Sequence, residues 1–270
     1  MSSASKIGFI GAGNMAEAII KGLAGNDKAK PDISAYDPNE ERLHLLEQNY
    51  GVRAAASNSD LVKSCDIIFL AVKPQIFGKV LKEINTEFSA AKLLLSIMAG
   101  ISTARIEEQL SEPPRLIRAM PNTPALVGQG ATALCAGSAA QKGDMDTAGS
   151  LFSAIGPVFE VSEAQMDAVT GLSGSGPAYV FSFIEALADG GVLNGLPRET
   201  ALELAIQTVI GAATLVKNTG EHPAMLRDKV CSPGGTTIAG VKALEANSFR
   251  NAIMEAVTSA TRRSRELGNN

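Results

Sequence analysis

The stretch best suited to bind a small anion lies near the C-terminal end, at residues 230–237, which read VCSPGGTT. Two glycines and three hydroxyl side chains there open an expected helix that continues through Ile238, Val241 and Leu244. A helix N-terminus carries unpaired N–H groups and partial positive charge, and glycine lets a ligand approach the backbone closely. The stretch therefore predicts a binding site for a small anion. A second interpretation stays open, in which Ser232 only caps the helix after a turn.

A second glycine motif stands at the other end of the chain. Residues 6–10 form a short apolar strand, residues 11–16 read GAGNMA, and helical periodicity follows. Strand, glycine turn and helix in this order are the dinucleotide-binding fingerprint: Gly11 permits the tight turn, Gly13 lets a pyrophosphate approach, and small Ala16 keeps helix and strand close. The residues assigned to this cradle are Gly11, Gly13, Asn14 and Met15.

An acidic residue follows the second expected strand, residues 32–36. Asp37 lies where a carboxylate accepts hydrogen bonds from an adenosine ribose, which favours NAD(H) and repels the extra phosphate of NADP(H). Alternatively, Asp37 caps the helix expected at residues 40–50, and Arg42 on that helix holds a 2′-phosphate. The cofactor is therefore NADP(H) or NAD(H), with the phosphate undecided.

Three further apolar runs, residues 66–72, 92–98 and 115–118, have the near-continuous hydrophobicity of parallel strands covered on both faces. Ligands bind beyond the carboxyl ends of such strands, so the segments that follow them should surround a nicotinamide. The residues placed there are Ala71, Val72, Lys73, Pro74, Met98, Ala99, Gly100, Pro121 and Asn122. For Lys73, a merely solvated strand end is the alternative.

The pattern changes near residue 162. Residues 130–136 and 158–161 are the last strand candidates, and apolar residues from 163 to 267 recur at helical spacing. We predict a Rossmann-type, doubly wound α/β domain at 1–162 and an all-helical substrate-binding and dimerisation domain at 163–270. The helices carry too much apolar surface for a thin bundle, which suggests that two chains intertwine them.

Composition excludes several classes of protein. The formal charge is −4 without a basic run, aromatic residues make up 4% and Trp is absent, which argues against nucleic-acid binding. Three scattered cysteines and two isolated histidines predict neither a disulfide framework nor a metal site. The N-terminus lacks signal-peptide features, and no apolar run is expected to reach the length that spans a membrane. The expected location is the cytoplasm.

With both ends considered, the chain resembles the pyrroline-5-carboxylate reductases over essentially its whole length. The resemblance rests on five motifs: GFIGAGNMA at 8–16, AVKP at 71–74, RAMPNTP at 118–124, GLSGSGPAY at 171–179 and VCSPGGTT at 230–237. Many dehydrogenases share the first motif. The last two in combination are highly specific to this family.

The resemblance implies an NAD(P)H-binding Rossmann domain and helical domains that interlock into a homodimer, which is often assembled into decamers. It adds Asn58 to the cofactor-lining residues and makes Ser232 and Thr237 catalytic candidates. Asp37 departs from the family pattern, because NADPH-preferring members usually place small hydroxyl or basic residues in that loop. The substrate-binding residues implied are Val230, Ser232, Gly234, Gly235, Thr236 and Thr237.

The implied reaction is reduction of a carboxylate-bearing cyclic imine to proline, the last step of proline biosynthesis. A protonated imine is already electrophilic, so positioning dominates, and we expect Thr237 to hydrogen-bond the ring nitrogen. One alternative is another imine reductase or a 3-hydroxyacid dehydrogenase, which needs a base such as Lys217, Lys229 or Lys242. The other is a non-enzymatic nucleotide-sensing or vitamin-B6-binding scaffold.

Overall fold

The computed structural model describes residues 5–25 and 31–268, and their contacts divide the chain into two compact units. The first unit comprises the chain up to Ser175 and the C-terminal segment from Ala260 onward, whereas the second comprises Gly176–Ser259. The change from mixed to purely helical structure does fall near residue 162, because the last strand ends at Glu160. The contact boundary lies later, so the helical residues 163–175 belong to the first unit.

The first unit is built on one sheet with the strand order β3-β2-β1-β4-β5-β6-β7-β8. All neighbouring strands are parallel except β6 and β7, which are antiparallel. This arrangement confirms the predicted Rossmann-type sheet, although the two-residue β3 was not expected. The strands are β1 (Lys6–Ile10), β2 (Asp32–Tyr36), β3 (Arg53–Ala54), β4 (Ile67–Leu70), β5 (Leu93–Ser96), β6 (Arg115–Met120), β7 (Thr132–Ala136) and β8 (Val158–Glu160).

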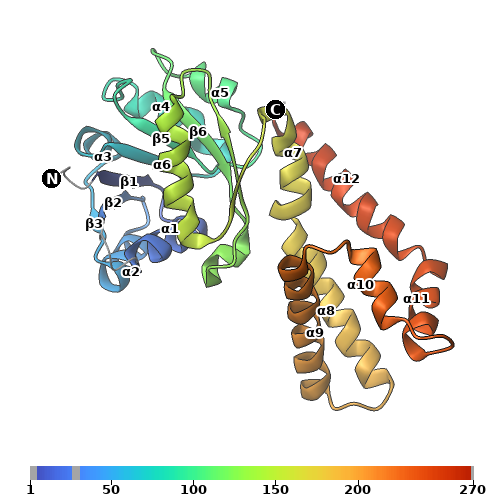
Figure 1. Ribbon diagram of the computed structural model, residues 1–270. Coiled ribbons are helices and arrows are strands. Elements are labelled where there is room, and N and C mark those ends of the chain that lie inside the picture. Colours follow the sequence, from blue (N-terminus) through green and yellow to red (C-terminus); the bar gives the residue numbers. More distant parts are fainter. Residues whose placement is uncertain (1–4, 26–30, 269–270) are drawn as a thin grey trace. The chain divides into compact units, whose positions relative to one another are not determined.

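Helices cover the sheet on both faces, which explains the near-continuous apolar strands (Figure 1). Consecutive residues of β1 point to opposite faces of the sheet, so Phe9 enters one core and Ile10 the other. Phe9 stacks on Phe69 with ring centroids 4.3 Å apart, and Phe152 meets the Phe69 ring edge-on. The helices of this unit are α1 (Asn14–Ala24), α2 (Glu40–Tyr50), α3 (Asn58–Ser64), α4 (Phe77–Ile84), α5 (Thr103–Glu107), α6 (Lys142–Phe152) and α7 (Met166–Val169).

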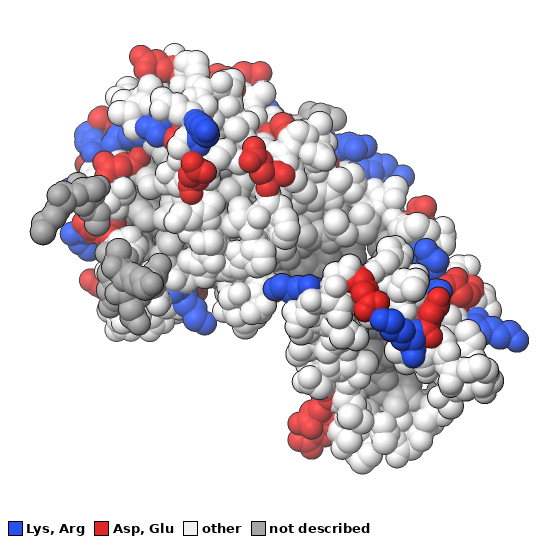
Figure 2. Space-filling model, in the orientation of Figure 1, with Lys and Arg blue, Asp and Glu red and all other residues white. Residues whose placement is uncertain are grey.

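The second unit consists of helices with very little core of their own. Its fully buried apolar side chains among the described residues are three alanines, Ala188, Ala201 and Ala205. Much of the surface of this unit that Figure 2 shows carries neither acidic nor basic residues. Its helices are α8 (Gly176–Leu193), α9 (Arg198–Thr219), α10 (Pro223–Val230), α11 (Thr236–Ala246) and α12 (Phe249–Gly268), of which α12 continues into the first unit. Its exposed large apolar residues include Leu187, Leu193, Leu202, Leu204, Ile206, Ile210, Leu215, Ile238, Leu244 and Met254.

Helix α9 corrects one expectation from the sequence. Its 22 residues are long and apolar enough to cross a membrane by length and composition, so the expectation that no run reaches that length was wrong. Length and composition alone are weak evidence, since a partner protein can cover the same apolar surface. Only 11% of its apolar window is buried within the chain.

A buried ion pair fastens α6 to the sheet and generates a stability prediction. Asp144 is fully buried and accepts hydrogen bonds from Arg115 and from the N–H of Gln141. Burial alone favours its neutral form, but these hydrogen bonds and the Arg115 charge hold the pKa of Asp144 below its usual range. A lowered pKa stabilises the fold above the unfolded-state value, and that stability is lost as the pH falls through the folded-state value.

We expect Asp144→Ala to lower the free energy of unfolding at pH 7 by about 2–3 kcal/mol, because it leaves Arg115 without its counter-charge. The difference from the native chain should persist at pH 4 and shrink only at lower pH, where native Asp144 is also protonated. Urea unfolding at pH 7, pH 4 and pH 2 measures both effects. Asp146→Ala, an exposed position on the same helix, is the control. An equal loss in the two variants would contradict the role of the buried pair.

Candidate active site

The glycine motif between β1 and α1 forms a cradle that a dinucleotide pyrophosphate would fit. Gly11 has φ +100°, and a Cβ on it would lie 2.5 Å from the carbonyl oxygen of Ala71, so only glycine is tolerated. Gly13 is the N-cap of α1 without a side-chain cap, and a Cβ there would meet open space. The first turn of α1 therefore offers N–H groups to an anion, with Asn14 exposed and Met15 partly buried beside them.

Asp37 is hydrogen-bonded to the backbone of this cradle. One carboxylate oxygen accepts the N–H of Ala12 at 2.8 Å and the other accepts the N–H of Asn39 at 2.9 Å. The N-cap of α2 is Asn39, whose side chain accepts from the N–H groups of Glu41 and Arg42. The alternative that Asp37 caps α2 is therefore wrong.

The ends of the central strands bring the predicted nicotinamide segments to one edge of the sheet. In the ladder Ile10 pairs with Leu70, Leu70 with Ser96 and Ser96 with Arg118, so the four strands end side by side. Of the predicted residues that follow β4, Lys73 is exposed, whereas Ala71, Val72 and Pro74 are partly buried. Of those that follow β5 and β6, Ala99 is exposed and the others, Met98, Gly100, Pro121 and Asn122, are buried.

The end of helix α12 supports the segment that contains Gly100. Gly100 has φ +74°, and a Cβ on it would contact Leu267 and Gly268. Arg105 donates to the carbonyl of Gly268 at 2.7 Å and places its guanidinium over the ring of Phe77, 5.4 Å from the centroid. Arg105 thus joins the helix end to the segment after Pro74, a contact that sequence spacing did not indicate.

Two asparagines implied as cofactor-lining are engaged by their own chain. Asn122 donates to the carbonyl of Ser173 at 3.0 Å and accepts the N–H of Ala131 at 2.9 Å, so its amide fastens loops together. Asn58 is buried at the start of α3, and its side-chain amide donates to Glu83 at 3.0 Å. The side-chain oxygen Oδ1 of Asn58 has no hydrogen-bond partner among the described atoms. Cofactor contact by either side chain stays a prediction.

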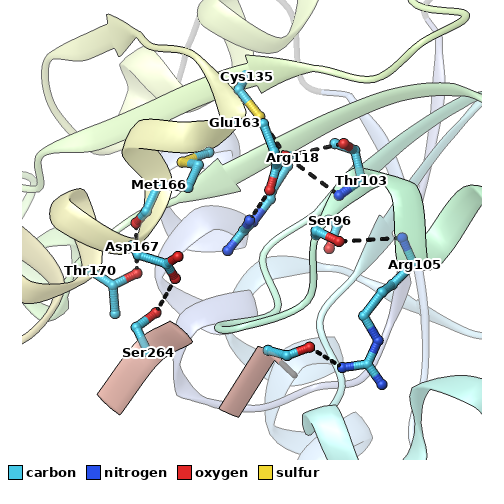
Figure 3. Close-up of polar contacts among 12 residues, drawn as sticks. Ser96, Thr103, Arg105, Arg118, Cys135, Glu163, Met166, Asp167, Thr170 and Ser264 are labelled. Atoms are coloured by element: carbon cyan, nitrogen blue, oxygen red, sulfur yellow. Dashed lines mark hydrogen bonds and ion pairs between the residues drawn. The ribbon is translucent and has the colours of Figure 1, made fainter. Parts of the chain in front are cut away.

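A buried arginine lies behind the Gly100 segment. Arg118, in the middle of β6, is 3% exposed and pairs with Glu163, which also accepts from Thr103 and Cys135 (Figure 3). Arg118, Glu163 and Gly100 line a pocket of about 300 Å³, together with Arg265 and Gly268 at the end of α12. Asp167 also lines it and accepts a hydrogen bond from Ser264 at 2.6 Å. The sequence indicates this cluster only through Arg118, a charged residue within a largely apolar strand.

The cluster sets the ionisation of its members. Burial favours the neutral acid, but hydrogen bonds from Cys135, Arg118 and Thr103 and the Arg118 charge hold the pKa of Glu163 below its usual range. Burial, followed by the bond to Glu163, raises the pKa of Cys135 to about 12. Cys135 is therefore a neutral thiol that donates to a carboxylate.

The C-terminal glycine motif belongs to the second unit. Helix α11 begins at Thr236, its N-cap is Gly235, and no side chain caps it, so the alternative of a capping Ser232 is wrong. Gly234 has φ +69°, and a Cβ on Gly235 would lie 2.2 Å from the Ser232 hydroxyl. The positive φ favours glycine at position 234, and a side chain at position 235 would displace the Ser232 hydroxyl. The neighbouring Val230, Ser232 and Thr236 are exposed and Thr237 is partly buried, so hydroxyls flank uncapped N–H groups.

Sequence reasoning missed the groups that hold the cradle from behind. The Arg42 guanidinium donates to the carbonyl of Ala12 at 2.9 Å and to Glu17 at 2.6 Å, and Tyr50 donates to Glu17 at 3.2 Å. Nothing in the spacing of these residues indicated that they meet. Over residues 5–25 and 31–268, no group of three His, Cys, Asp or Glu side chains could hold a metal ion.

The sheet, the glycine cradle and the separate helical unit define a dinucleotide-binding oxidoreductase with a helical dimerisation domain. Family models match in the same two parts: "NADP oxidoreductase coenzyme F420-dependent" over residues 6–100 and "Pyrroline-5-carboxylate reductase dimerisation" over residues 163–267. The chain belongs to the pyrroline-5-carboxylate reductase family, as its relatives show.

The pyrroline-5-carboxylate reductase of Arabidopsis thaliana is 48% identical over 97% of this chain and 95% of its own length. That of a Synechocystis strain is 50% identical over 97% of this chain and 98% of its own length. A crystal structure of the Plasmodium falciparum pyrroline carboxylate reductase with NADP bound superimposes with a TM-score of 0.88 at 37% identity, covering 98% of both chains.

We expect Glu163→Gln to lower the free energy of unfolding by about 2–3 kcal/mol, because buried Arg118 then faces a neutral partner. Thermal and urea unfolding followed by circular dichroism measure the change. Glu160→Gln, an exposed position on β8, should change stability by less than about 0.5 kcal/mol. A stability of Glu163→Gln equal to that of the native chain would show that the pair does not hold the cluster together.

Proposed function

We propose that this chain reduces the C=N bond of 1-pyrroline-5-carboxylate to give L-proline, the last step of proline biosynthesis. The observation that carries the proposal is the uncapped N-terminus of α11, which follows Gly234 and Gly235 and has hydroxyl side chains around it. It suits a small carboxylate and a neighbouring ring nitrogen without requiring a charged side chain. Family membership supports the same activity.

The proposal assigns a role to each group at that helix end. The free N–H groups after Gly235 and the hydroxyls of Ser232 and Thr236 bind the carboxylate, and Val230 packs on the ring. The hydroxyl oxygen of Thr237 accepts a hydrogen bond from the protonated imine nitrogen, which keeps the ring oriented. NAD(P)H, when bound at the glycine cradle of the first unit, supplies the hydride. The chain thus contributes orientation and charge complementarity rather than a strong acid.

A second candidate, a hydroxyacid dehydrogenase, gains no support. Such an enzyme needs a general base, often a lysine. Lys229 donates to both carboxylate oxygens of Glu221 at 2.8 and 2.6 Å, and neither Lys217 nor Lys242 lies in a motif that matches such enzymes. Rapid oxidation of a 3-hydroxyacid with NAD(P)⁺ would favour this candidate. Absence of any turnover with firm cofactor binding would favour a non-enzymatic scaffold.

We also propose that the assembly is a homodimer with interlocked helical domains, which can build a decamer. The second unit buries only small alanines as apolar core, while large residues such as Leu193 and Ile210 stay exposed. A helical unit with so little core needs a partner for its apolar surface. We place the protein in the cytoplasm, where its three free cysteines stay reduced.

The native chain should reduce pyrroline-5-carboxylate, and Thr237→Ala should lower kcat/KM by about ten- to a hundredfold, since one hydrogen bond to the reacting ring is lost. Thr237→Ser should retain most of the activity. Initial rates at saturating NADH and NADPH measure this. Thr147→Ala, which removes a hydroxyl bonded within α6, is the control. Unchanged efficiency in Thr237→Ala would remove this residue from the mechanism.

Light scattering at micromolar concentration should give at least twice the chain mass of 28.0 kDa. Ile210→Glu, which places a charge in the exposed apolar surface of α9, should shift the population towards monomers because the buried charge would lack a partner. Val127→Glu, at a more exposed apolar residue of the first unit, should leave the mass unchanged. A monomeric native chain would contradict the dimer.

A further inference from the structure

We propose that this chain uses NAD(H) in preference to NADP(H), and that Asp37 determines the choice. The inference deepens the proposed function and rests on its placement of the cofactor at the glycine cradle. It starts from a pocket of about 610 Å³ between the end of β2 and helix α2, beside that cradle. Its lining includes Tyr36, Asp37, Leu43, His44 and the segment 54–56. An adenosine with its ribose is the part of the cofactor that this position takes.

Asp37 lines this pocket and is held there by two hydrogen bonds. Its two oxygens accept separate backbone N–H groups, from Ala12 of the cradle and from Asn39 at the start of α2. Because Asn39 provides the helix cap, these bonds are not explained by capping. Each carboxylate oxygen accepts more than one hydrogen bond, so Asp37 can still accept the hydroxyls of a ribose. A 2′-phosphate offers no such donor and brings two like charges.

The other charges of the pocket act in the same direction. Glu40 and Glu47 also line it, and among its described lining residues there is no lysine or arginine. His44 bonds Gln48 through Nε2, and its Nδ1 lies 3.7 Å from Glu47. A 2′-phosphate would therefore lie among three carboxylates without a fixed cation. Like charges placed together in this way give strong discrimination between ligands.

Arg42 is the cation that the sequence offered as a phosphate ligand, and the structure assigns it to another role. Its guanidinium is held by the Ala12 carbonyl and by Glu17, which Tyr50 also contacts, and it is absent from the pocket lining. Asp37 and Arg42 thus hold the N–H and the C=O of the same residue. Arg42 is a positioning residue of the cradle. A structure of the Plasmodium relative contains NADP, so the preference proposed here is for this chain and not for the family as a whole.

Binding of nucleotides without the nicotinamide tests this inference separately from catalysis. Calorimetry on the full chain should show ADP-ribose binding at least about tenfold more tightly than 2′-phospho-ADP-ribose. Asp37→Asn, which keeps an acceptor for Ala12, and Asp37→Ser should each reduce that ratio to about threefold or less. Arg42→Gln should weaken both ligands alike and leave the ratio within about twofold. Glu41→Gln, exposed on the same helix, is the control.

The outcomes separate the inference from the proposed reaction. Equal or tighter binding of 2′-phospho-ADP-ribose by the native chain would overturn the inference while leaving the reductase activity possible with NADPH. Selective loss of that ligand in Arg42→Gln would make Arg42 a phosphate ligand and overturn it too. A preserved preference for ADP-ribose without turnover of the cyclic imine would support the inference and contradict the reaction. Binding of neither ligand would overturn the cofactor site and the inference together.

Discussion

The close approach of two backbone segments, Gly11 after β1 and Ala71 after β4, is the constraint on which the cofactor half depends. A Cβ at Gly11 would lie 2.5 Å from the Ala71 carbonyl oxygen, so one added methyl group would push the neighbouring strand ends apart. Those ends carry the cradle and the predicted nicotinamide segments. The parallel ladder and the stacked Phe9 and Phe69 rings keep them in register. Because the core is close-packed, a displacement here would be transmitted to every segment at that edge.

Behind that edge, charged groups hold the backbone instead of meeting the ligand. Arg42 holds the carbonyl of Ala12, Arg105 holds the end of α12, and Arg118 is paired with Glu163 beneath the Gly100 segment. Supporting contacts of this kind make a binding site rigid, which matters when orientation rather than acid–base chemistry accelerates the reaction. The helical unit lacks such internal support, because its buried core consists of small alanines while many large apolar residues are exposed. We therefore expect a second chain to cover this apolar surface.

Much of this could be predicted from the sequence. Apolar runs bounded by glycine and proline indicated the strands of the sheet except β3, whose two residues carry no pattern. The change to purely helical structure near residue 162 could be predicted, because helical spacing replaces the strand pattern there. The contact boundary at Ser175 was not, because it depends on which helices pack against the sheet. The same limit applies to Arg42, Glu17 and Tyr50, which lie far apart in the sequence and meet only through the fold.

The sequence by itself determined the family, the glycine cradle and the helix end with its hydroxyls, because these depend on residue types at fixed short spacings. Only the tertiary structure excluded the helix-cap interpretation of Asp37 and showed which partners Arg42 has. The letters alone fit a capping Asp37, but in the fold Asn39 is the cap of α2 and one Asp37 oxygen accepts the N–H of Ala12 in the cradle. The Ala12–Asp37 and Glu17–Arg42 contacts each join residues 25 positions apart, which sequence spacing does not reveal. Local sequence encodes the groups, and packing decides which partners they find.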